Sequence, residues 1–134
     1  MDANTDYEEI RYEIEDGRAR ITLARPKTHN AMTPLLLEEL EDALWEADED
    51  SAVHSVILRG EGASFSSGYD LTSLGGKKRP GYRTGRTHDD DIWLIERNNR
   101  RIRALWDMHK PSIAQVHGNC LAGGTDLALA WDMV

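Results

Sequence analysis

The sequence predicts an α/β fold, and three observations support this prediction. Two short segments near the start alternate apolar and polar residues, which is typical of strands with one buried face. Later segments repeat one order, an apolar strand, a glycine loop and a helix. Strands that alternate with helices are the pattern of an α/β domain. A chain of 134 residues with 40% hydrophobic content is sufficient for the core of one domain.

The first predicted elements are a β-hairpin and a helix. Residues 10–14 and 19–23 alternate in polarity, and Asp16-Gly17 between them favours a tight turn. Thr33 followed by Pro34 predicts a helix start near residue 34. Leucines and alanines at three- and four-residue spacing form its apolar stripe. The other side is acidic, and we expect it to be solvated surface: Glu38, Glu39, Glu41, Asp42, Glu46 and Glu49.

A second unit follows this helix. The continuous apolar run in Val53–Arg59 favours a short strand buried on both faces, as in a parallel sheet. A turn with Gly68 at its break comes next. Residues 75–88 then lose periodicity and combine glycines, a proline and basic side chains. We therefore predict a flexible surface loop over 75–88.

The third unit begins with a long helix that opens with Asp89-Asp90-Asp91 and stops at Pro111. Its apolar stripe has one polar member and consists of Ile92, Ile95, Asn99, Ile102 and Trp106. Ser112–Val116 is predicted to be another apolar strand.

After a glycine-broken loop, Gly123 and Gly124 open an apolar helix that carries a single acid, Asp126. The first N–H groups of a helix lack internal partners and favour negative charge. Close packing of helix and strand, with Asp126 as a first-turn charge, explains the same residues without a ligand.

Composition excludes several classes of function. A net charge of −8 argues against general binding to nucleic acid or to a membrane surface. The five histidines lack paired metal-ligand spacing, so we expect no metal site. Cys120 is the only cysteine, which suits a reducing, cytoplasmic setting. The acidic, polar N-terminal residues predict neither a signal peptide nor a membrane anchor.

The sequence lacks the usual motifs of nucleotide-binding proteins and of serine hydrolases. Phe65 stands where a dinucleotide-binding fingerprint starting at Gly60 needs its third glycine, and no phosphate loop is present. Neither Ser66 nor Ser67 lies in a nucleophile elbow. A serine nucleophile with a distant histidine stays open, although we expect both serines to serve the turn.

Three motifs, in order, resemble those of the enoyl-CoA hydratase/isomerase (crotonase) superfamily. They are Ile21–Lys27 with Asn30-Ala31, then Phe65–Leu71, then Val116–Gly118 with Leu121–Ala128. The resemblance implies a spiral of repeated ββα units, with residues 1–134 forming the N-terminal portion of an acyl-CoA-binding core. It also implies that no cofactor is permanently bound and that coenzyme A enters as part of the substrate.

The resemblance implies a catalytic site built from backbone. The N–H groups of Tyr69 and Gly123 would hold the thioester oxygen, on which charge builds when an enolate forms. Asp126 falls where hydratases of the family commonly carry an acid/base glutamate. Aspartate is one methylene shorter, so simple hydration is not assured. The loop along coenzyme A would comprise Lys27, Thr28, His29 and Ala31, with Gly68, Asp70 and Leu71 continuing its wall.

The chain departs from the family in length. Residues 131–134 begin a new apolar segment without a helix stop, so the fold is expected to be truncated. In the longer family members the missing half carries a second acid/base residue and helices that build trimers, so a full-length protein is expected to be a homotrimer or hexamer. The resemblance leaves three functions open: an enoyl-CoA hydratase or isomerase, a crotonase-like hydrolase of a thioester or carbon–carbon bond, and a catalytically incomplete acyl-CoA-binding protein.

Overall fold

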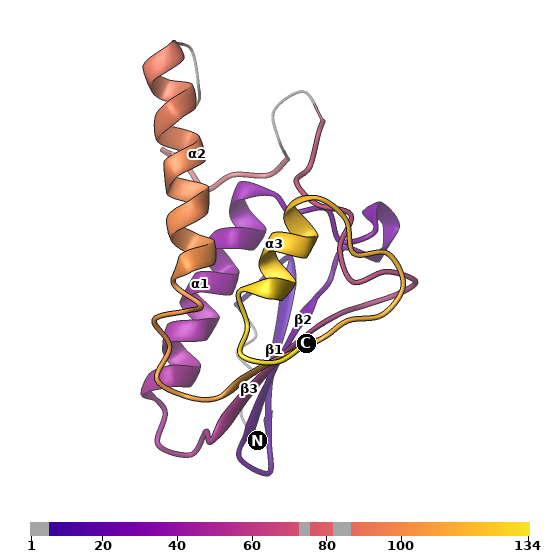
Figure 1. The fold of residues 1–134 in the computed structure, drawn as a ribbon, viewed down its shortest axis with the longest axis vertical. Coiled ribbons are helices and arrows are strands. Elements are labelled where there is room, and N and C mark those ends of the chain that lie inside the picture. Colours follow the sequence, from indigo (N-terminus) through magenta and orange to yellow (C-terminus); the bar gives the residue numbers. More distant parts are fainter. Residues whose placement is uncertain (1–5, 73–75, 82–86) are drawn as a thin grey trace.

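A four-stranded sheet organises the part of the chain that the computed structural model describes, residues 6–72, 76–81 and 87–134. Its strands lie in the order β1-β2-β3-β4. Their bounds are Ile10–Glu15 for β1, Arg18–Leu23 for β2, Ser55–Gly60 for β3 and Ser112–Gln115 for β4. Three α-helices and one 3₁₀ helix are present among these residues (Figure 1): η1 (Pro26–Thr28), α1 (Pro34–Glu49), α2 (His88–Arg103) and α3 (Gly123–Leu129).

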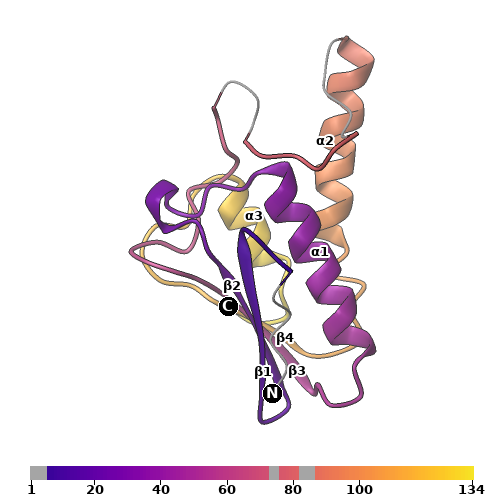
Figure 2. The ribbon, with the colours of Figure 1, turned by 180° about the vertical axis from the view of Figure 1, so that it is seen from behind.

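The predicted hairpin is confirmed. β1 and β2 pair antiparallel, with Tyr12 opposite Ile21. β1 is the edge strand of the sheet and lies in front in Figure 2. Asp16 and Gly17 form the turn with φ values of 50° and 75°. Two residues at positive φ match the right-handed twist of the flanking strands.

The remaining strands run parallel, so their carboxyl ends lie at one edge of the sheet. α1 connects β2 to β3, and α2 connects β3 to β4. Leu23, the last residue of β2, is paired with Gly60, the last residue of β3. The loops that follow the parallel strands therefore start side by side. In open α/β sheets, ligands bind at this edge.

One face of the sheet forms the core, together with buried residues of α1 and α3. In β3, Val56 and Leu58 are fully buried on this face, whereas Ile57 on the other face is only partly buried. The prediction that this strand is buried on both faces was therefore wrong. The outer face carries charged side chains, including Arg20, which pairs with Glu13.

The α1 helix begins as predicted, because the Thr33 side chain accepts a hydrogen bond from the N–H of Leu36 at 3.0 Å. Its acidic face, however, is not all solvated. Glu39 is buried and accepts hydrogen bonds from the N–H groups of Glu8 and Glu9, at 2.9 Å and 2.8 Å. Glu38 is also buried. Backbone and arginine donors supply what water would otherwise supply to these carboxylates.

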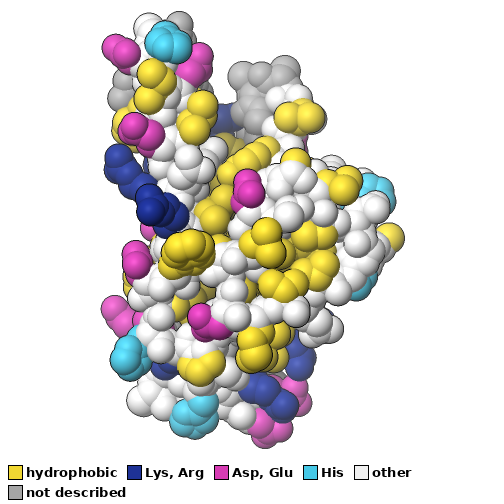
Figure 3. Space-filling view, viewed as in Figure 1, with side chains coloured by type: hydrophobic (Ala, Val, Ile, Leu, Met, Phe, Trp, Pro, Cys, Tyr) yellow, Lys and Arg dark blue, Asp and Glu magenta, His cyan; other side chains and the backbone are white. Residues whose placement is uncertain are grey.

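The α2 helix differs from its prediction in three ways. It ends at Arg103 and not at Pro111. Its N-cap is Thr87, which forms a capping box with Asp90, rather than the run of three aspartates. Most of the predicted apolar stripe is exposed: Ile95 is 62% exposed, and Trp106, which lies beyond the end of α2, is 70% exposed, whereas Ile102 packs against the core. Figure 3 shows hydrophobic side chains at the surface along α2 and over α3. The side of α2 that faces α1 instead carries arginines.

The predicted loop 75–88 is described only in part, because Gly75 and residues 82–86 lie outside the described residues. The described part is tied to the body of the protein. The N–H of Leu35 donates to the Lys77 carbonyl at 3.0 Å, and Arg79 pairs with Asp42 at 2.8 Å. Over the described ranges, every helix is too short or too polar to span a bilayer.

Candidate functional site

Three loops meet at the carboxyl edge of the parallel strands and are bonded main chain to main chain. Met32 and Tyr69 form a parallel bridge, in which the Met32 N–H donates to the Gly68 carbonyl at 2.7 Å. Ser66 and Cys120 form a second parallel bridge, and the Leu121 N–H donates to the Ser66 carbonyl at 3.0 Å. The middle loop is thus fixed on both sides.

Gly68 allows the middle and last loops to approach closely. Its φ is +101°, a conformation that side chains rarely adopt. A Cβ built on Gly68 would lie 3.1 Å from the Leu121 carbonyl oxygen and 3.3 Å from the Gly123 nitrogen. Gly68 therefore places the backbone at Tyr69 beside the first residue of α3.

Two backbone N–H groups are unpaired at this junction. The bridge to Met32 uses the Gly68 carbonyl and the Asp70 N–H, so the N–H of Tyr69 points away from that bridge. Gly123 is the first residue of α3, where an N–H has no intrahelical acceptor. Within the described part of the chain, no acceptor contacts either N–H.

Tyr69 and Asp126 flank these N–H groups. A Cβ on Gly123 would lie 2.6 Å from the Tyr69 ring, so the ring packs directly on that glycine. Burial raises the pKa of the Tyr69 phenol, and the negative charge of Asp126 raises it further. Asp126 itself is exposed on the first turn of α3, rather than enclosed in an apolar pocket.

The loop after β2 presents the residues expected along coenzyme A. Lys27, Thr28 and His29 are exposed, whereas Ala31 is buried. His29 is left-handed, with φ 53°, and its carbonyl accepts from the Ser67 N–H at 2.9 Å. A cavity of about 390 Å³ lies along this loop and is lined by Ala24, Arg25, Pro26, Lys27 and Thr28.

The serines serve the turn, as predicted. The Ser66 hydroxyl donates to the Asn30 carbonyl at 2.9 Å, and the Ser67 hydroxyl donates to the Thr28 carbonyl at 3.2 Å. Neither hydroxyl contacts a histidine of the described chain. His29 does contact a serine, Ser64, at 2.9 Å, but Ser64 is only 1% exposed and cannot meet a substrate.

The last loop depends on glycine at one position. Gly118 has φ +61°, and a Cβ there would lie 2.0 Å from the Ala63 carbonyl oxygen. His117 next to it holds the Gly62 carbonyl through Nε2 at 2.7 Å. Cys120 is half-buried beside the core. These contacts give His117 and Cys120 structural roles.

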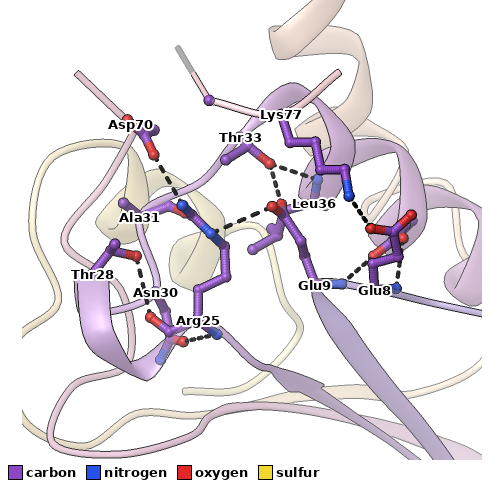
Figure 4. A network of polar contacts seen from close by, with 12 residues as sticks. Glu8, Glu9, Arg25, Thr28, Asn30, Ala31, Thr33, Leu36, Asp70 and Lys77 are labelled. Atoms are coloured by element: carbon purple, nitrogen blue, oxygen red, sulfur yellow. Dashed lines mark hydrogen bonds and ion pairs between the residues drawn. The ribbon is translucent and has the colours of Figure 1, made fainter. Parts of the chain in front are cut away.

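Arg25 is a site residue to which the sequence motif gave no role. Its guanidinium contacts the carboxylate of Asp70 at 3.1 Å and that of Glu9 at 3.5 Å (Figure 4). Hydrogen bonds from Thr72, together with Arg25, hold the pKa of Asp70 below its usual range. The Asp70 side chain is thus enclosed by its partners, whereas that of Leu71, the next residue, is 95% exposed.

Comparison with known proteins shows the family to which this chain belongs. The family model described as Enoyl-CoA hydratase/isomerase matches residues 13–134. A protein from Mycobacterium tuberculosis, named as an enoyl-CoA hydratase, is 40% identical over 96% of this chain and 45% of its own length. A 4-chlorobenzoyl coenzyme A dehalogenase from an Arthrobacter species is 31% identical over 99% of this chain and 46% of its own.

Solved structures show the same likeness. The crystal structure of an enoyl-CoA hydratase/isomerase from Xanthobacter autotrophicus superposes with a TM-score of 0.82 and 39% identity, over 95% of this chain and 45% of that one. The chain thus spans slightly less than half the length of the curated relatives named above. On both sequence and structure, it belongs to the enoyl-CoA hydratase/isomerase (crotonase) family and has that family's α/β fold.

Proposed function

We propose that this chain binds an acyl-CoA thioester and supplies the N–H groups of Tyr69 and Gly123 to the thioester oxygen. The observation that carries the proposal is the pair of unpaired N–H groups that Gly68 brings together from two loops. The reaction best supported is that of an enoyl-CoA hydratase or isomerase.

The chemistry follows from where charge develops. Adding water to a conjugated enoyl thioester, or removing an α-proton, moves negative charge onto the thioester oxygen. A fixed donor aimed at that oxygen is worth about 3 kcal/mol in the transition state. Backbone donors suit this task because their positions are set by the fold and not by a side-chain rotamer.

Asp126 is the proposed acid/base group. Its carboxylate takes or returns the proton while the two N–H groups hold the enolate oxygen. Asp70, which follows Tyr69, is unsuited to this role because its carboxylate is held by Arg25 and Thr72. In the whole protein a second acid would complete the pair.

The coenzyme A portion would lie along the loop after β2. Lys27, Thr28, His29 and Ala31 would meet the adenine and pantetheine, and Asp70 and Leu71 would continue the wall. The cavity along this loop and the charge of Lys27 support that placement. A homotrimer or hexamer in the cytoplasm is proposed for the whole protein by analogy with the family.

A second reaction is favoured by the length of the Asp126 side chain. A shorter carboxylate reaches the substrate differently, and one relative is named as a dehalogenase. Hydrolysis of a thioester or of a carbon–carbon bond is therefore the alternative. Binding of acyl-CoA without turnover is the third, because the chain spans less than half of its relatives.

Crotonyl-CoA hydration tests the proposal. Asp126→Asn keeps the shape of the side chain, and we expect kcat to fall at least about 10²-fold because acid/base catalysis is lost. Glu49→Gln, at an exposed position of α1, is the control and should hydrate at the unsubstituted rate.

Four other outcomes of this assay would change or overturn the proposal. Equal rates in both variants would remove Asp126 from the mechanism. Release of free coenzyme A would replace hydration by hydrolysis, and binding without turnover would assign the chain a carrier role. Absence of crotonyl-CoA binding would overturn the proposal itself.

A further inference from the structure

Arg25 joins three segments of chain at the candidate site. It follows β2, and its guanidinium lies between the Ala31 carbonyl, the Asp70 carboxylate and the Glu9 carboxylate (Figure 4). The side chains are 19% exposed for Arg25, 5% for Asp70 and 12% for Glu9. Charges this well covered are poorly screened, so the cluster holds its geometry more firmly than a surface pair does.

Two of these contacts flank the bridge that fixes Tyr69. Ala31 directly precedes Met32, and Asp70 directly follows Tyr69, and the bridge joins Met32 to Tyr69. One nitrogen of the guanidinium, Nη1, bonds both the Ala31 carbonyl and Asp70 Oδ2. The main-chain bridge and the Arg25 side chain therefore hold the same two loops together at the same place.

The two oxygens of Asp70 have separate partners. Oδ1 accepts from the N–H and the hydroxyl of Thr72, at 2.9 Å and 2.6 Å, whereas Oδ2 accepts from Arg25. The Thr72 contacts orient the carboxylate within its own loop. Of the contacts that the Asp70 carboxylate makes, the one with Arg25 reaches the loop after β2, beside the main-chain bonds that already join the two loops.

Glu9 extends the cluster to the start of α1. Its carboxylate contacts Arg25 Nε at 3.5 Å and also accepts from the Thr33 hydroxyl, which caps α1. A guanidinium is planar and presents several donors in fixed directions, which a lysine ammonium cannot reproduce. The site thus uses an arginine where three segments must keep one relative position.

We propose that Arg25 is a positioning residue that fixes the Tyr69 N–H, through Ala31 and Asp70, at the place where the thioester oxygen binds. This inference rests on the proposed function. Without Arg25, the partly buried carboxylates of Asp70 and Glu9 lose their shared cation, and the Met32–Tyr69 bridge loses the side-chain contacts on either side of it, so the Tyr69 N–H shifts. A donor displaced by about 1 Å can cost about 10²-fold in rate.

The test uses the 134-residue chain with crotonyl-CoA bound at saturation. Infrared difference spectra report how far hydrogen bonds polarise the thioester carbonyl, through the downward shift of its stretching frequency. We expect a downward shift in the unsubstituted chain, loss of most of that shift in Arg25→Gln, and partial loss in Arg25→Lys. Arg20→Gln removes an arginine with two ion pairs outside the site and should leave the shift unchanged.

The outcomes separate the two claims. No carbonyl shift in the unsubstituted chain overturns the proposed function. A full shift in both the unsubstituted chain and Arg25→Gln overturns the role of Arg25 alone. If Arg25→Gln does not fold, Arg25→Lys and Asp70→Asn decide: reduced shifts in both support the inference, and a full shift in either overturns it.

Discussion

The two long helices are held to the protein by different forces. α1 packs on β1 and β2 through apolar side chains, among them Leu36, Leu40 and Leu44, each at most 3% exposed. α2 packs on α1 through arginines, and Arg101 is the only residue of α2 that is buried among those described. Arg97 and Arg101 both contact Glu38, at 2.8 Å and 2.6 Å.

The two kinds of contact differ in what they contribute: apolar contacts stabilise the domain, and ionic contacts fix the position of a helix. Apolar burial is large and tolerates small shifts in angle. An ion pair is directional, and its net value after desolvation is small, although breaking one half of a buried pair is costly. α1 therefore contributes to the stability of the whole domain, whereas the contacts of α2 mainly determine where α2 lies.

The largest effect on stability is expected from the apolar contacts of α1. Leu44→Ala should lower the free energy of unfolding by about 3 kcal/mol, because a fully buried leucine leaves a cavity. Urea denaturation measures the loss, which should be global. Leu71→Ala, at a position 95% exposed, is the control and should change little. A loss below about 1 kcal/mol would contradict apolar docking of α1.

A smaller, local effect on stability is expected from the ion pairs between α1 and α2. Glu38→Gln leaves Arg101 with Glu41 at 3.4 Å as its remaining acidic partner and should cost about 2 kcal/mol. Hydrogen exchange should rise in α2 while α1 and the sheet stay protected. Glu96→Gln, which loses only an exposed pair with Arg100, should change little. Uniform loss of protection would show that the two helices act as one unit.

The smallest effect at neutral pH concerns Tyr12 on β1. Its hydroxyl is buried and has no hydrogen-bond partner in the described structure. Burial first, and then the charges of Glu46 and Asp50 at the end of α1, raises its pKa from 10.0 to about 12. The folded protein thus keeps the phenol proton more tightly than the unfolded chain does.

The sign of the pH dependence follows from that difference. The Tyr12 contribution is fully present below pH 10 and is lost as pH rises from 10.0 to about 12. Tyr12→Phe should change stability by less than about 1 kcal/mol at neutral pH, and it should reduce the alkaline loss. Urea midpoints measured across this range check it. An unchanged alkaline profile in the variant would contradict the prediction.

Local pattern was sufficient for much of the fold. The Asp16-Gly17 turn, the Thr33-Pro34 helix start and the glycine-led start of α3 depend on neighbouring residues, and the structure has all of them. Partners distant in sequence were not predictable in this way. The α2 stripe has helical periodicity, but periodicity alone does not say which side meets the protein, and Glu38 attracts the arginine side.

At the candidate site, too, local features could be predicted from the sequence, whereas contacts between distant residues could not. Gly68 and Gly123 could be singled out because glycines at loop ends indicate close backbone approach. The pairing of Arg25 with Asp70 could not, because it spans 45 positions and depends on the sheet bringing two loops together. A lone arginine between a buried strand and Pro26 was the available signal, since such a cation requires an acidic partner.

The main-chain bridges at Met32 and at Cys120 have a consequence for how such a protein changes over evolutionary time. They set the directions of the Tyr69 and Gly123 N–H groups without help from the side chains of Tyr69 or Asp126. Under the proposed function, mutation at those two positions therefore changes the side chains that flank the N–H groups while the main-chain bridges are kept. A fold of this kind separates the part that must be preserved from the part that is free to diversify.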